Sequence, residues 1–152
     1  MGFLYLVLKF IHILAAIVAV GSNITYGVWS VRAGKDSSHL GFALKGIKFL
    51  DDRIANPAYG VLLLTGLILV FVGHWSITSL WILIALVLFA AVVVFGVAFY
   101  SPLLKNQIRL VDAGEAGSPE YARLAALGAR FGPGLGIIVV VILVMMVFKP
   151  SL

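Results

Sequence analysis

Four long apolar stretches, separated by polar links, fill almost the whole 152-residue chain. They cover about residues 3–31, 55–73, 79–104 and 127–148. Each is close to or above the ~20 residues that a helix needs to cross the hydrocarbon core of a bilayer. Lipid leaves only helices or closed barrels, and the lack of apolar–polar alternation excludes a barrel. The sequence therefore predicts a single all-α integral membrane domain over residues 1–152, a four-transmembrane-helix antiparallel bundle.

The composition excludes several other classes of protein. The chain is 62% hydrophobic and 11% charged, whereas soluble domains carry about 25% charged residues, so there is no room for a second, soluble domain. Cysteine is absent, which excludes disulfides and thiolate metal sites. The basic residues do not form a patch with interleaved aromatics, so no nucleic-acid partner is expected.

The basic residues predict the topology of the bundle. The links between the first and second stretches and between the third and fourth, together with Arg130 at the start of the fourth stretch, hold nine of the eleven Lys and Arg residues; only Lys9 and Lys149 lie elsewhere. With four spans, both of these links lie on the same side. The positive-inside rule then places them in the cytoplasm and both termini outside.

The first link contains a segment of its own. From Leu40 to Ile54, apolar and charged residues alternate at helical spacing, which predicts an amphipathic helix lying at the membrane interface. Asn56 and Pro57 suit the N-cap and the first turn of the second transmembrane helix. The short link at residues 73–78 carries no formal charge and is expected to join neighbouring antiparallel helices.

A polar stripe runs along the first transmembrane helix. Successive helix residues turn by about 100°, and this turn brings six polar residues to one face: Tyr5, Lys9, His12, Asn23, Tyr26 and Ser30. Lipid cannot satisfy such a stripe, so it is expected to face the bundle interior, a cavity or a ligand. Ala15, Ala16 and Ala19 border the stripe and leave space for a close helix or a flat cofactor.

His12 is the residue on which any chemistry depends, and three interpretations of it stay open. A neutral imidazole can hydrogen-bond a neighbouring helix. It can instead be an axial ligand of haem iron, or part of a proton relay. Lys9 has two interpretations as well: its stem can snorkel to the headgroups, or its ammonium can pair with a haem propionate.

The remaining candidates are weaker. His74 suits an interfacial position, although a tilted helix would let it serve as a second metal ligand; Arg53 can point inward to an anionic group. Gly128, Gly132 and Gly136 form two small-xxx-small steps, which favour close packing within the bundle or across a homodimer.

No recognised catalytic motif is present in the sequence. All six acidic residues lie in the two basic links, which argues against a transporter driven by carboxylates within the membrane.

Two segments resemble a known superfamily. "LKFIHILAAIVAVG" (residues 8–21) and "DDRIANPAYGVLLLTGLIL" (residues 51–69) resemble small membrane proteins that include the copper-resistance D family and the haem-containing bacterial protoporphyrinogen oxidase HemJ. "YSPLLKNQIRL" (residues 100–110) and "MMVFKP" (residues 145–150) are more similar to a sister family of predicted integral membrane proteins of unknown function.

The resemblance implies a four-helix bundle in a bacterial inner membrane and, in the oxidase branch, haem binding at the position of His12. The oxidase pattern has a His and a Lys near the start of the third helix, where this chain reads "WSITSLWILI", so the resemblance does not extend to the oxidase activity. The leading hypothesis is binding of haem b by His12, with Lys9, Asn23, Tyr26 and Arg53 around it. The alternatives are a non-enzymatic accessory subunit and a small-solute or ion permease.

Overall fold

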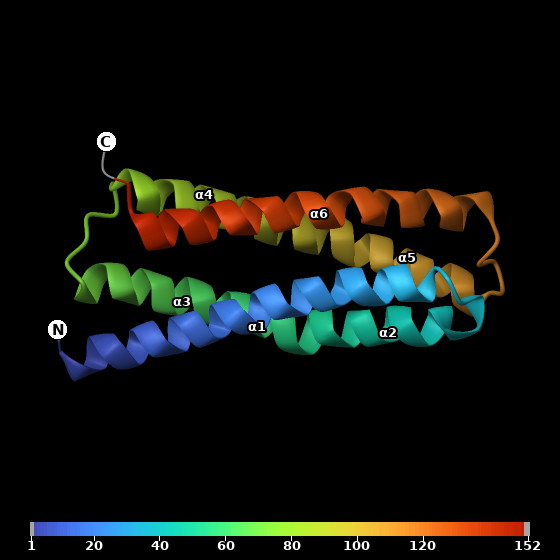
Figure 1. Cartoon of the computed structure of the whole chain (residues 1–152), viewed down its shortest axis with the longest axis horizontal. Helices are drawn as coiled ribbons and strands as arrows, with labels where there is room; N and C mark the ends of the chain where they lie inside the picture. Colours follow the sequence, from blue (N-terminus) through green and yellow to red (C-terminus); the bar gives the residue numbers. More distant parts are fainter. Residues whose placement is uncertain (1, 151–152) are drawn as a thin grey trace.

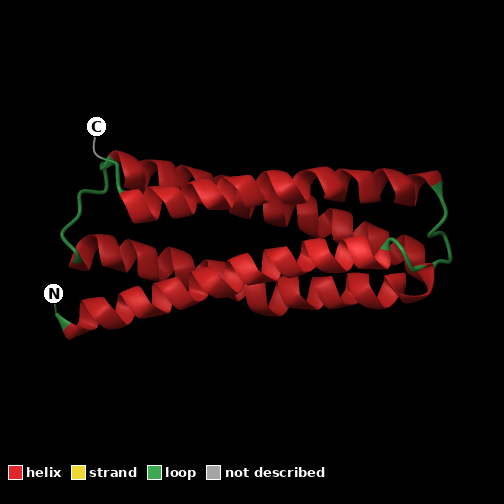
Figure 2. Cartoon of the chain, viewed as in Figure 1, coloured by secondary structure: helices red, strands yellow, loops and turns green. Residues whose placement is uncertain are grey.

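The computed structural model describes residues 2–150, apart from the side chain of Ser37. The described residues form an elongated bundle of helices without any strand (Figures 1 and 2). Four continuous helical segments are long and apolar enough to cross a membrane: Phe3–Ala33, Leu40–Val72, Leu80–Asp112 and Pro119–Phe148. The predicted all-α bundle with four spans is therefore confirmed.

The two ends of the bundle differ in which segments they carry. One end, which we call the termini end, carries both chain ends and the α3–α4 link. The other, which we call the basic end, carries the α1–α2 and α5–α6 links (Figure 1). At the basic end, α1 (Phe3–Ala33) is followed by the short 3₁₀ turn η1 (Ser37–His39) and by α2 (Leu40–Leu50).

The second span contains a proline but does not begin there. α2 passes through the π-helical turn η2 (Asp51–Ala55) directly into α3 (Asn56–Val72). The N–H of Asn56 donates to the carbonyl of Asp51, five residues back. Proline has no N–H and crowds the carbonyl four residues before it, and the wider π turn removes that conflict before Pro57. Asn56 has helical backbone angles and does not cap, so the predicted helix start at Asn56–Pro57 is wrong.

The third span also contains a π-helical turn directly before a proline. α4 (Leu80–Phe95) passes through the π-helical turn η3 (Gly96–Tyr100) into α5 (Ser101–Asp112), and the N–H of Ser101 donates to the carbonyl of Gly96. The proline here is Pro102. The helix thus runs to Asp112, past the end at about residue 104 expected from apolarity. α6 (Pro119–Phe148) likewise starts earlier than residue 127, because Ser118 caps it by accepting a hydrogen bond from the Tyr121 N–H at 3.1 Å.

The predicted interfacial helix is not confirmed. α2 stands upright as the continuation of α3 and packs against α1 and α5 (Figure 1). Its apolar face is buried in the bundle through Leu40, Ala43, Leu44 and Ile47. Lys45 adds an exposed ion pair with Asp112 of α5, with 2.7 Å between Nζ and Oδ1.

Most of the packed core lies towards the basic end. One cluster of buried residues joins α1, α2, η2 and α5: Tyr26, Ala33, Leu40, Ala43, Leu44, Ile47, Ala55 and Leu104. In the half nearer the termini, α1 pairs with α3 and α4 pairs with α6. The 73–78 link joins the antiparallel helices α3 and α4, although α3 packs mainly on α1 and α4 mainly on α6 (Figure 1).

An aromatic clamp joins the pairs at the termini end. Lys149 follows the last residue of α6, and its Nζ lies 4.5 Å from the Trp75 ring centre and 5.4 Å from that of Trp81. The two indoles meet edge to face, with 5.5 Å between centres. Such cation–π contacts contribute about 0.5–2 kcal/mol each, so this clamp connects the α3–α4 link to the end of α6.

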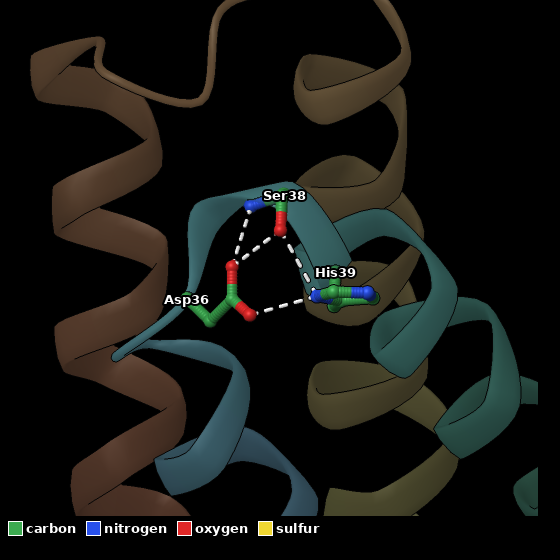
Figure 3. A network of polar contacts seen from close by, with 3 residues as sticks. All are labelled: Asp36, Ser38 and His39. Carbon is green, nitrogen blue, oxygen red and sulfur yellow. Dashed lines mark hydrogen bonds and ion pairs between the residues drawn. The ribbon is translucent and has the colours of Figure 1, made fainter.

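Hydrogen bonds within the chain order the α1–α2 link at the basic end. The Asp36 carboxylate accepts from the Ser38 N–H at 3.0 Å and from the Ser38 hydroxyl, and lies 2.7 Å from His39 Nδ1 (Figure 3). The Ser38 bonds, followed by the His39 contact, lower the pKa of Asp36 from 3.8 to about 2. These bonds set the turn that leads into α2. His39 itself is exposed, as its place in a polar link predicts.

Candidate functional site

His12 lies on the face of α1 that meets α3. Its ring is half-buried, and Nδ1 lies 2.8 Å from Oγ1 of Thr65, a buried residue of α3. The Thr65 hydroxyl also lies 2.6 Å from the carbonyl oxygen of Val61. A hydroxyl has one hydrogen to donate, and a carbonyl can only accept. We therefore infer that Thr65 donates to Val61 and accepts from the Nδ1–H of His12.

This arrangement sets the tautomer of a neutral imidazole. With the proton on Nδ1, the lone pair is on Nε2. Among the described residues, the side-chain hydrogen bond of His12 is made through Nδ1, and no side chain hydrogen-bonds Nε2. His12 is thus oriented through one nitrogen and leaves the other free as a Lewis base.

Gly66 lets the imidazole lie against α3. A Cβ added at this position would come within 3.1 Å of His12 Cε1, closer than ordinary van der Waals contact. Sequence reasoning missed both Thr65 and Gly66 as partners of His12. The sequence did contain an indication of this contact, because Thr65 and Gly66 supply a hydroxyl and a small residue in the second span at the depth of His12.

The space beside the small residues that border the stripe is occupied by a neighbouring helix. Ala15 and Ala19 are buried, and α1 and α3 pack closely together. Of the two expectations for these alanines, a close helix or a flat cofactor, the structure shows the close helix. The free side of the imidazole is the side that bears Nε2.

The other predicted site residues do not gather around His12. Lys9, one turn away, is exposed, and so is Arg53. Arg53 lies twelve residues before Thr65, or about 18 Å along the helix. His74 follows Thr65 by nine residues, about 13 Å of helix rise, and is exposed with a left-handed φ of 54°. Of the six stripe residues, Tyr5 and Tyr26 are buried, His12 and Asn23 are half-buried, and Lys9 and Ser30 are exposed.

Asn23 and Tyr26 belong to a second polar cluster, near the two π-helical turns. Asn23 Nδ2 donates to the Tyr59 hydroxyl at 2.5 Å and to the Ala19 carbonyl at 3.1 Å. The Tyr26 ring stacks on that of Tyr100, with 6.2 Å between centres. Among the described residues, the Tyr26 hydroxyl is the one buried side-chain polar atom without a hydrogen-bond partner. The predicted stripe thus divides into a His12 region and a tyrosine cluster.

Neither a multi-residue metal centre nor a glycine interface is visible within residues 2–150. No group of three or more His, Asp and Glu side chains there could hold a metal ion. Gly128 packs within the chain, since a Cβ added there would lie 3.5 Å from Leu103 Cδ2, whereas Gly132 and Gly136 have open space beside them. Any metal chemistry at His12 therefore needs a metal that brings most of its own ligands.

The fold and its four apolar spans define a small multi-pass integral membrane protein. The chain belongs to the DUF2269 family of predicted integral membrane proteins, whose family model matches residues 6–150. No curated protein and no solved structure matches the chain. The sister-family part of the resemblance is thus supported at the level of a small membrane-protein family.

Proposed function

We propose that this protein binds b-type haem, with Nε2 of His12 as an axial ligand, and serves electron transfer or haem handling. The observation that carries the proposal is the orientation of His12 by Thr65, which leaves Nε2 free. Haem iron in proteins is commonly held by a neutral histidine. Metal-ligating histidines usually donate their other N–H to a fixed acceptor, which orients the ring and raises its basicity.

The surroundings of His12 are compatible with such a ligand. His12 lies in the part of α1 that pairs with α3, while α4 and α6 form the other pair. Lys9, one turn away on α1, offers a cation for a propionate. Asn23 and Tyr26 hydrogen-bond or stack elsewhere and Arg53 is distant, so the proposal relies on Lys9 alone for that role. When bound, the haem would supply one-electron redox chemistry.

The proposal includes the orientation and location of the protein. Residues 32–53 and 105–130, which include the links at the basic end, hold nine of the eleven Lys and Arg residues, which favours a cytoplasmic basic end and external termini. The resemblance to the copper-resistance D and oxidase superfamily favours a bacterial inner membrane and motivates haem as the ligand.

An absorption spectrum of the detergent-purified protein, expressed with ample haem, tests this proposal. We expect a Soret band that disappears in His12→Ala and remains in His74→Ala and His39→Ala, two matched histidine controls that are exposed. A colourless wild-type protein would overturn haem binding. A band that persists in a folded His12→Ala variant would overturn the assignment of the ligand.

One observation favours a second function, that of a non-enzymatic accessory subunit. No residue of α6, all of which is described, is buried, and the His12–Thr65 bond is sufficient to join two helices without a cofactor. A colourless protein that copurifies with a stable, stoichiometric membrane partner would support this alternative over haem binding.

A further inference from the structure

An exposed aromatic face lies on the outside of the α1–α2 pair at the basic end. We define it by Trp29 of α1 and by Phe42, Gly46 and Phe49 of α2. Phe42 is 76% exposed, Phe49 62% and Trp29 44%. Together with Leu50 they line an apolar pocket of about 260 Å³. The opposite face of α2 is buried in the core, so this face is left unpartnered within the chain.

The depth of the bilayer places part of this face in water. Arg53 lies nineteen residues before Val72, a rise of about 29 Å, which matches the ~30 Å hydrocarbon core. Phe42 lies eleven residues further from the membrane, about 16 Å beyond Arg53. The headgroup layer adds only about 5–8 Å on each side. Phe42 is therefore too far out to be covered by lipid, unlike the other exposed apolar side chains of the spans.

The charges next to the aromatic face are positive. Arg53 continues the row of Phe42, Gly46 and Phe49 on α2 at i+4 spacing, and Arg32 follows Trp29 on α1. Both arginines are exposed, and no carboxylate within residues 2–150 pairs with either of them. The nearby Asp52 is already paired with Lys48. Water-exposed apolar patches of this kind mark interaction sites, and unpaired arginines at the rim favour carboxylates.

We propose that the aromatic face is a docking site for an acidic amphipathic helix of a partner protein. Apolar side chains of that helix enter the pocket between Trp29, Phe42 and Phe49, while its flanking carboxylates meet Arg32 and Arg53. This is the helix-in-groove mode of recognition, with specificity set by the charged rim. The site is separate from His12 and does not depend on haem binding.

Binding of a synthetic peptide tests the site. The protein is reconstituted in nanodiscs of uncharged lipid, and the probe is a labelled amphipathic peptide of about 18 residues, long enough to form a helix, with Leu on one face and Glu on the other. The matched probe carries Lys in place of Glu. Fluorescence anisotropy is expected to show at least tenfold tighter binding of the Glu peptide, and this preference should weaken as salt is raised.

Variants assign the binding to the aromatic face. Phe42→Ser and Arg53→Gln are each expected to weaken binding at least fivefold, whereas Phe42→Leu and Lys105→Gln, an exposed cation of α5, should stay within twofold of wild type. Phe42 is so exposed that its replacement leaves the core intact, which retention of a monodisperse elution profile checks. Equal binding of both peptides, or unchanged binding by Phe42→Ser and Arg53→Gln, would overturn the proposal.

Two further outcomes would assign another occupant and overturn the proposal. The chain has no cysteine, so Phe42→Cys allows a single spin label. If oxygen dissolved in the lipid relaxes this label more than an aqueous nickel reagent does, the bilayer covers the face. If the protein is a dimer in nanodiscs and Phe42→Ser makes it monomeric, a second copy covers it. We expect an aqueous label and a monomer.

Discussion

The basic end and the termini half of this bundle are held together in different ways. At the basic end, α2 and α5 extend the bundle beyond the apolar spans and bury a continuous core that includes Ile47 and Leu104. Towards the termini the helices associate in pairs: α1 meets α3 through small residues and single polar contacts, such as Ala19 and the His12–Thr65 bond, and α4 buries Ile82 near its start. In water, burial of apolar surface drives packing, but lipid tails are as apolar as leucine and give no such drive.

The largest effect that this comparison predicts comes from a cavity at the basic end. Ile47 is 1% exposed, so Ile47→Ala should cost about 2–5 kcal/mol of stability. The matched truncation Val87→Ala, at a residue of α4 that is 67% exposed, should cost little. Denaturant titration in detergent, followed by circular dichroism, measures both. Similar losses for the two variants would mean that burial of Ile47 in the core of the basic end is not what makes its truncation costly.

Tyr26 gives the next largest effect. Its buried hydroxyl has no partner within the described residues, and such a group costs about 1–3 kcal/mol. Tyr26→Phe keeps the stack on Tyr100 and should therefore raise stability in the same titration. A loss instead would mean that the hydroxyl makes a hydrogen bond, for example to water.

Thr65→Val tests the termini half. The change removes the acceptor of the His12 Nδ1–H while keeping the volume similar, and should cost about 1 kcal/mol, the typical net value of a hydrogen bond. Under the proposed function it also broadens or shifts the haem absorption bands, because the ring is no longer oriented. Thr25→Val is the control, since Thr25 bonds only within its own helix. Equal effects of the two substitutions would contradict a link between the helices.

A smaller, stabilising effect is expected from His74→Gly at the termini end. His74 lies two residues after the end of α3 and has a left-handed φ of 54°, a conformation that costs a side chain about 1–2 kcal/mol relative to glycine. We expect a gain of up to about 1 kcal/mol, because the unfolded chain also becomes more flexible. A loss of stability would show that the imidazole makes a contact that outweighs the strain.

The smallest effect concerns pH at the α1–α2 link. Since folding lowers the pKa of Asp36 from 3.8 to about 2, its contribution is fully present above pH 3.8 and disappears as the pH falls through 2. The amide resonance of Ser38 should shift with that midpoint. A midpoint near 3.8 would mean that the bonds in Figure 3 do not persist in solution.

The sequence predicted the spans well because continuous apolarity over about 20 residues has few other interpretations. It failed where a helix continues beyond the apolar stretch. Pro57 looked like a helix start, since proline is rarely found inside a helix, and nothing local shows that a π turn can precede it. α2 looked interfacial because an amphipathic pattern is the same whether its apolar face meets lipid or other helices.

The candidate site was predicted only in part. Helical spacing identified the stripe on α1 that includes His12, Asn23 and Tyr26, but spacing on one helix does not give the partners on another. Thr65 and Gly66 become partners of His12, and Tyr59 a partner of Asn23, only through the relative depth of α1 and α3. The haem interpretation of His12 stays a prediction.

The turn at Asp51–Ala55 has a consequence for how the two halves evolve together. A π turn accommodates one residue more than an α turn, so it sets the rotational phase of α2 relative to α3. The extra residue of this turn could be lost with little rotation of α2, because an α turn would take its place, whereas a further inserted residue that is not absorbed would rotate α2 by about 100° about its axis and bring Leu44 and Ile47 out of the interior. The turn is therefore the place in the second span where a change of one residue in length is best accommodated.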